Sequence, residues 1–201
     1  HLQWFETLLP GKYYLSFYLG SSFLALGEPA KALEHFREAL NRRPPVEEMA
    51  TIYSYSGVCH KELGQFRRAL KVLQERKKTY IRSLAGVNYD LLELGGGDAS
   101  STVISPDIFD TYVAPYDSEL IALAHEAGQR IAYHTCGGMM PILENIAAMN
   151  PDAMETFTPA GMGGDTRLGE AKKRIGDKVC MIGGFDQFHF FKGCTPEETR
   201  R

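Results

Sequence analysis

From about residue 88 onward, short apolar segments alternate with stretches of helical spacing. The expected strands are 89–94, 131–134, 153–157 and 179–183. The expected helices lie between them, at 105–128, 140–149 and 166–175. This alternation predicts βα units whose strands form a parallel sheet. A glycine-rich or polar loop follows each strand, and in barrels and open parallel sheets these loops carry the chemistry.

Residues 13–75 have a different period and repeat themselves. Glycines and apolar residues recur 37 positions apart, in the pairs Gly20/Gly57, Gly27/Gly64, Ala32/Ala69 and Phe36/Leu73. A fixed period of this size predicts stacked helical hairpins. The two segments resemble tetratricopeptide repeats, which bind peptides or partner proteins, although their period exceeds the usual ~34 residues. A plain pair of helical hairpins is the alternative.

His134 and Cys136 end the second expected strand. Side chains at i and i+2 of an extended segment point to the same face, so an imidazole and a thiolate can converge on one ion. That pairing suits Zn²⁺. Glu155 ends the next strand and could reach the same loop as a further ligand. The alternative is a packed imidazole, an inert thiol and a carboxylate bonded to nearby backbone.

The loops after the later strands contain further candidates. Gly183, Gly184 and Asp186 are expected to face a substrate or cofactor, or else to form a turn in which the aspartate bonds its own backbone. Asp165 is expected to be the N-cap of the following helix, with an anion-binding loop as the alternative. His189 is expected to be a packed surface histidine. Cys59 and Cys180 are expected to be core residues.

Composition narrows the class of protein. Hydrophobic residues make up 44% of the chain and charged residues 23%, which is typical of a soluble globular protein. A formal charge of −3 gives no reason to expect a nucleic-acid partner, and no apolar run approaches the ~18 residues that span a membrane. Four widely spaced cysteines favour a reduced, cytoplasmic protein. Because the sequence starts at His1 without a methionine, we expect it to be the interior of a longer chain.

Several segments of the second half together carry a family resemblance. They are Ser105-Pro106-Asp107-Ile108-Phe109, Pro115-Tyr116, His125-Glu126-Ala127-Gly128, His134-Thr135-Cys136-Gly137, Leu168-Gly169-Glu170-Ala171-Lys172 and Gly183-Gly184-Phe185-Asp186. With them, residues ~80–201 resemble the uroporphyrinogen decarboxylase-like superfamily, whose fold is a (β/α)₈ barrel. The expected fold class is therefore α plus α/β, with helical hairpins over 1–79 and a partial barrel of about four βα units over 80–201.

The resemblance also implies a chemistry. The superfamily includes a haem-pathway decarboxylase that works without metal, and cobalamin-linked methyltransferases whose zinc-binding motif resembles His134-Thr135-Cys136. It implies zinc-dependent transfer of a methyl group from methylcobalamin, held on a corrinoid protein, to a small thiol. Glu155 and Asp186 would then be catalytic, and Gly183 and Gly184 would face the cofactor.

A third thiolate ligand is expected beyond Arg201, with Cys194 as the weaker candidate. Two other functions stay open at this point. One is metal-free tetrapyrrole decarboxylation, and the other is a non-catalytic module that binds proteins through the helical repeats.

Overall fold

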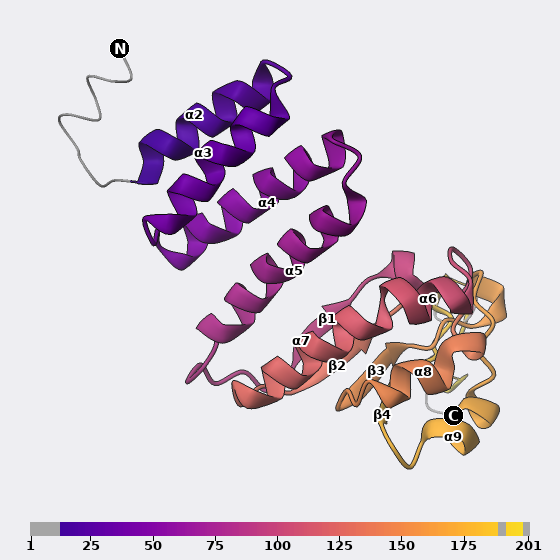
Figure 1. The fold of residues 1–201 in the computed structure, drawn as a ribbon. Coiled ribbons are helices and arrows are strands. Elements are labelled where there is room, and N and C mark those ends of the chain that lie inside the picture. The colour runs from indigo at the N-terminus through magenta and orange to yellow at the C-terminus, as the bar shows by residue number, and fades with distance from the viewer. Residues whose placement is uncertain (1–12, 189–191, 199–201) are drawn as a thin grey trace. The chain divides into compact units, whose positions relative to one another are not determined.

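The computed structural model describes residues 13–188 and 192–198 (Figure 1). These form two compact units that divide between Leu84 and Ala85. His189, for which a surface position was expected, lies outside the described residues. In the described ranges, no helix has the length and apolar character that crossing a membrane requires.

The first unit consists of two helical hairpins. Its helices are α2 (Tyr13–Ala25), α3 (Pro29–Asn41), α4 (Val46–Glu62) and α5 (Phe66–Ser83). A Cβ on Gly20 would lie 2.6 Å from the Phe36 ring, and a Cβ on Gly57 would lie 2.8 Å from the Leu73 side chain. The same close helix crossing therefore recurs at the 37-residue spacing, which confirms the predicted hairpins.

Aromatic and aliphatic side chains between these hairpins form a separate core. Phe36, Ile52 and Cys59 are fully buried there. Burial raises the pKa of the Cys59 thiol to about 11, so this cysteine is protonated at neutral pH. Cys59 is thus the inert core residue that the sequence predicts.

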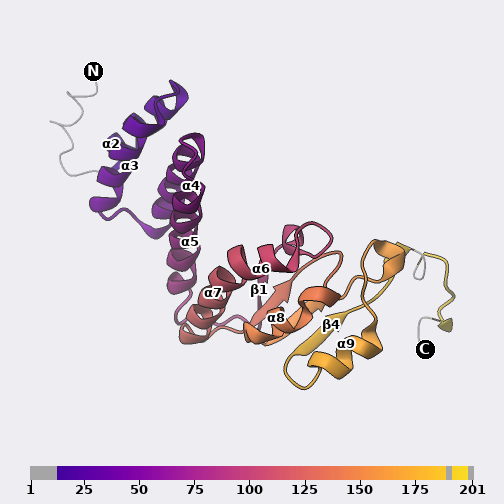
Figure 2. The same cartoon turned by 45° about the vertical axis from the view of Figure 1, so that its right-hand side comes forward.

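The second unit is built on four parallel strands. They are β1 (Leu92–Gly95), β2 (Ile131–His134), β3 (Ala153–Thr156) and β4 (Cys180–Gly183), and they pair in chain order. Right-handed crossovers between consecutive parallel strands place their helices on one face of the sheet. Figure 2 shows α7, α8 and α9 along one side of the strands. Chain-order pairing with helices on one face is the arrangement of a partial barrel.

The helices of this unit are shorter than the sequence pattern predicts. They are α6 (Pro106–Tyr112), α7 (Ala114–Glu126), α8 (Leu143–Ala148) and α9 (Leu168–Ile175), with 3₁₀ turns η1 (Gly97–Ala99), η2 (Met140–Ile142) and η3 (Ala160–Met162). The single helix expected over 105–128 is two helices, because Pro115 lies in the first turn of α7 and has no N–H to continue α6. Ser105 caps α6 by accepting the Ile108 N–H at 3.3 Å.

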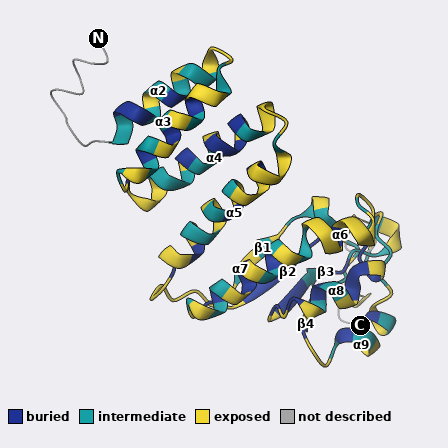
Figure 3. Cartoon of the chain, in the orientation of Figure 1, coloured by how far each residue is buried: buried dark blue, intermediate teal, exposed yellow. Residues whose placement is uncertain are grey.

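Strand β2 is buried along most of its length (Figure 3), whereas β4 is mostly exposed. Tyr133 and Met154 are fully buried on the helix side, where the Tyr133 hydroxyl donates to Asp117 of α7 at 2.8 Å. Burial and the Asp117 carboxylate both raise the pKa of Tyr133. The opposite face carries Cys180, because that residue is in register with Ala153 and so shares a face with Glu155. The prediction that Cys180 is a core residue is wrong, since it is exposed.

Asp152, just before β3, ties β2 to the end of α7. Its Oδ2 accepts the Ile131 N–H at 2.8 Å and contacts His125 Nε2 at 2.9 Å. Partial burial opposes ionisation, but the Ile131 N–H and the His125 imidazole together outweigh it, and the pKa of Asp152 is lowered. The ionised carboxylate is therefore the form that the fold stabilises.

A lowered carboxyl pKa makes stability depend on pH. The contribution is present above the unfolded pKa of ~3.9 and is lost as pH falls through the lower folded value. We expect Asp152→Asn to reduce the free energy of unfolding at pH 7 by about 1–2 kcal/mol, and by less than that below pH ~4. Urea unfolding at several pH values, with exposed Asp90→Asn as the control, measures the difference. Equal losses in the two variants would contradict the assignment.

Candidate metal and substrate site

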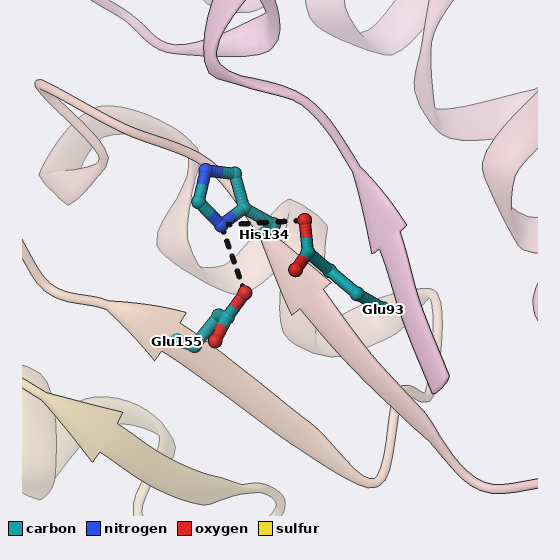
Figure 4. Close-up of side chains that lie close together, drawn as sticks. All are labelled: Glu93, His134 and Glu155. Atoms are coloured by element: carbon teal, nitrogen blue, oxygen red, sulfur yellow. Dashed lines mark hydrogen bonds and ion pairs between the residues drawn. The ribbon is translucent and has the colours of Figure 1, made fainter. Parts of the chain in front are cut away.

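Three side chains meet where the first three strands end (Figure 4). His134 is in register with Glu155 of β3 and with Gly95 of β1, so Glu93, two residues before Gly95, lies on the same face. His134 Nδ1 is 2.8 Å from Glu155 Oε1 and 3.8 Å from Glu93 Oε1. The His134 and Glu155 side chains are 23% and 26% exposed, whereas Glu93 is 67% exposed.

The other nitrogen of the same imidazole meets the thiol. His134 Nε2 lies 2.9 Å from Cys136 Sγ. The structure thus brings His134, Cys136 and Glu155 together, but it places the carboxylate and the sulfur at opposite ring nitrogens. An imidazole binds an ion through one nitrogen, and the hydrogen bond at the other nitrogen sets which one it is. The imidazole, the thiol and the Glu155 carboxylate therefore cannot all bind the same ion in this arrangement.

Two donor sets follow from this geometry. One uses Nδ1 with Glu93 and Glu155, whose ligand atoms all lie within 4.8 Å of one another. That set is rich in oxygen and suits a hard cation. The other uses Nε2 with the Cys136 thiolate and leaves Glu155 to hold Nδ1–H. This second set fits zinc, because zinc favours sulfur and nitrogen and its histidine ligands commonly donate their second N–H to a carboxylate.

Glu93 was not among the site residues that the sequence predicts. It is an acidic residue in the expected strand 89–94, and that break in an apolar pattern is the signal that could have found it. Its distance of 3.8 Å from Nδ1 is longer than a hydrogen bond.

The loop after β2 is held in place by hydroxyl and carboxylate acceptors. The Gly137 N–H donates to Thr158 Oγ1 at 3.1 Å, and the Gly138 N–H donates to Thr102 Oγ1 at 2.6 Å. Asp165 Oδ1 accepts the N–H groups of both Met139 and Met140. The expectation that Asp165 caps the helix after it is wrong, since Asp165 instead caps the η2 turn after Cys136 and α9 begins after Arg167 without a side-chain cap.

The chain turns sharply directly after Glu155. Thr156 and Phe157 have φ values of 77° and 44°, a left-handed conformation that is uncommon for residues other than glycine. Thr156 Oγ1 donates to the carbonyl of Thr135 at 2.5 Å, and Thr135 lies between His134 and Cys136. This turn therefore fixes Glu155 relative to the segment that bears the imidazole and the thiol.

A cavity of about 450 Å³ lies beside these groups. Its lining includes Cys136 and Glu155 together with the apolar residues Pro159, Met162, Ile182 and Phe185. Gly183 and Gly184, predicted to face a cofactor, also line it. A Cβ on Gly183 would lie 2.6 Å from the Thr156 carbonyl oxygen, so this close approach requires glycine.

Asp186 and Cys194 are placed differently from these lining residues. Asp186 does not line the cavity, and its Oδ1 accepts the N–H of Phe188 at 3.1 Å. This is the turn that the sequence offered as an alternative to a catalytic role. Among the described residues, the cluster of possible metal ligands does not include Cys194, which is partly buried.

The sequence and fold are similar to known proteins. The family model for uroporphyrinogen decarboxylase matches residues 48–201, so the match begins within α4. A solved methyltransferase from Methanosarcina mazei has a TM-score of 0.50 and 18% identity, over 77% of this chain and 48% of that one. The chain thus spans about half the length of that structure, and at this identity the likeness concerns the fold alone. No curated protein matches the sequence.

The comparisons give no support to a tetratricopeptide assignment of the helical hairpins. Because the family model covers most of the sequence, including all four βα units, the chain belongs to the uroporphyrinogen decarboxylase family.

Proposed function

We propose that this chain takes part in transferring a methyl group from a corrinoid, carried by a partner protein, to a thiol substrate, with zinc bound by His134 Nε2 and Cys136. The observation that supports this proposal is the His134 imidazole, held between the Glu155 carboxylate and the Cys136 sulfur beside a cavity. The similarity to the fold of a methyltransferase agrees with it.

Glu155 has a positioning role in this proposal. By accepting a hydrogen bond from Nδ1–H, the Glu155 carboxylate would fix the tautomer of His134 and direct the Nε2 lone pair toward Cys136. The Thr156 bond to the Thr135 carbonyl keeps that arrangement in register. A zinc ion held by these two donors would keep ligand positions for a substrate, and Cys136 lines the cavity.

The chemistry needs a thiolate nucleophile. Zinc at this position would lower the pKa of a coordinated thiol, which then loses its proton. The corrinoid would supply the methyl group: the substrate sulfur would bond to the methyl carbon as the carbon–cobalt bond breaks, the electron pair would stay on cobalt, and the thiol proton would pass to solvent. The part of this chain is to hold the sulfur in the cavity and to exclude water from it with Met162 and Phe185.

Cobalt(II) can replace zinc as a visible probe of the donor set. We expect the chain under reducing conditions to bind one Co²⁺ and to show a thiolate-to-metal charge-transfer band. Cys136→Ser should remove the band. Cys180→Ser is the matched control, because Cys180 is an exposed cysteine on the same face of the sheet, and it should leave the band unchanged. A chain without the band, or a band that persists in Cys136→Ser, would overturn the proposal.

A further inference from the structure

The four residues that follow Cys136 are held through their backbone N–H groups. Each of these groups, at positions 137–140, donates to a side-chain oxygen. The acceptors are, in chain order, Thr158 Oγ1 at 3.1 Å, Thr102 Oγ1 at 2.6 Å, and Asp165 Oδ1 at 2.8 and 3.2 Å for the last two. The path of the chain directly after the thiol therefore depends on three side chains from outside this segment.

Three loops meet at Gly138, two residues after the thiol. The Ser101 N–H, in the loop after β1, donates to the Gly138 carbonyl at 2.8 Å. A Cβ on Gly138 would lie 2.6 Å from Ser101 Oγ and 3.3 Å from Asp165 Oδ2, which belongs to the loop after β3. Contacts this close from two neighbouring loops leave the segment little room to shift as long as both loops stay in place.

Asp165 makes the strongest of these attachments. A single oxygen of its carboxylate accepts the N–H groups of both Met139 and Met140, and hydrogen bonds to a carboxylate are stronger than those to a hydroxyl. Arg174 of α9 contacts the same turn, because its Nη2 donates to the Met140 carbonyl at 2.9 Å. The segment from Asp165 through α9 therefore binds both backbone polar groups of Met140.

The position of the Cys136 sulfur depends on this anchoring. Cys136 is exposed, so packing restrains its side chain less than it would in a core. Its Sγ meets His134 Nε2 at 2.9 Å, and a Cβ on Gly97 would lie at an ordinary contact distance of 3.6 Å from it. A metal site needs its donors held within about 0.5 Å of the productive geometry. The anchored backbone after Cys136 is the part of the fold that can supply this precision.

We infer that Asp165 is a positioning residue for the thiolate ligand, in the way that Glu155 is for the imidazole. This inference rests on the proposed function, because it concerns the metal that His134 and Cys136 would bind. Without the Asp165 carboxylate, two successive N–H groups lose their acceptor and the turn after the thiol can move away from the loop after β3. Outer groups that orient metal ligands typically change metal affinity by roughly 10- to 100-fold.

Substitutions at Asp165 test the inference through the affinity for Co²⁺ and the sulfur-to-cobalt charge-transfer band. We expect Asp165→Ala to weaken Co²⁺ binding at least about tenfold and to reduce the band at saturation. Asp165→Asn keeps an oxygen that can accept both N–H groups, so it should retain the affinity within about threefold. Ser105→Ala is the control, because it removes a cap from α6, elsewhere in the same unit, and should leave the affinity and the band unchanged.

Circular dichroism shows whether each variant is folded. If Asp165→Ala does not fold, then Thr102→Val removes the acceptor of the Gly138 N–H in its place and should weaken Co²⁺ binding at least about threefold. A folded variant with unchanged affinity and band would overturn the positioning role and leave the proposed function intact. Equal losses in the test variant and in Ser105→Ala would overturn it too. An unsubstituted chain without a Cys136-dependent band would overturn the proposed function and this inference together.

Discussion

Substitution Gly95→Ala is expected to lower the free energy of unfolding of the βα unit by at least about 3 kcal/mol. Gly95 ends β1 with a φ of +117°, which an L-residue adopts only with strain. A Cβ there would also lie 2.3 Å from the carbonyl oxygen of His134, its register partner. The Cβ is fixed directly to the backbone of β1 and the oxygen belongs to the backbone of β2, so neither atom can move aside without separating the two strands.

Alanine substitutions at two other glycines separate the backbone strain from the steric clash that Gly95→Ala introduces. Gly86 has a φ of +81° but open space around its Cβ position, so Gly86→Ala reports the backbone strain alone, about 1 kcal/mol. Gly96 has an extended φ of 166° and open space, so Gly96→Ala should be nearly neutral. Hydrogen exchange of peptides that cover β1 and β2 measures the stability of the βα unit separately from that of the helical hairpins α2–α5. If Gly95→Ala loses no more protection than Gly86→Ala, then the strands do not approach each other this closely.

Much of the βα unit could be predicted because its sequence pattern is local. Apolar segments such as 131–134 followed by glycine loops identify buried parallel strands, and the strands appear at these positions. The face on which a residue lies is not local. Cys180 sits in an apolar segment that reads as core, but pairing with β3 places it on the face opposite the helices. Only the register between two strands decides this.

The candidate site could also be predicted only in part. Adjacent parallel strands end at the same edge, so the approach of Glu155 to His134 followed from their positions in neighbouring strands. Which ring nitrogen each partner meets depends on side-chain rotation, which no sequence pattern contains. Likewise, Asp165 caps a turn about 25 residues before it, and Thr156 adopts a left-handed conformation that its residue type disfavours. These features depend on tertiary contacts.

The two carboxylates near His134 should differ strongly in their effect on metal binding. We expect Glu155→Gln to weaken Co²⁺ binding 10- to 100-fold, because it removes the charged acceptor that fixes the imidazole at Nδ1. Glu93→Gln should change binding less than about threefold, since Glu93 is mostly exposed and its oxygen is 3.8 Å from the ring. The pair is well matched, because both residues lie on the same face, each is converted to its amide, and each flanks the same histidine.

The same pair distinguishes the two donor sets. If the ion binds Nδ1 with both carboxylates, then Glu93→Gln and Glu155→Gln should weaken binding similarly, and Cys136→Ser should leave it nearly unchanged. If it binds Nε2 with the thiolate, then Cys136→Ser should have the largest effect and Glu93→Gln the smallest. Isothermal titration with Co²⁺ measures the affinities, and the charge-transfer band reports the sulfur independently. Because a thiolate is a much better ligand for zinc than a second carboxylate, we expect the order Cys136, Glu155, Glu93.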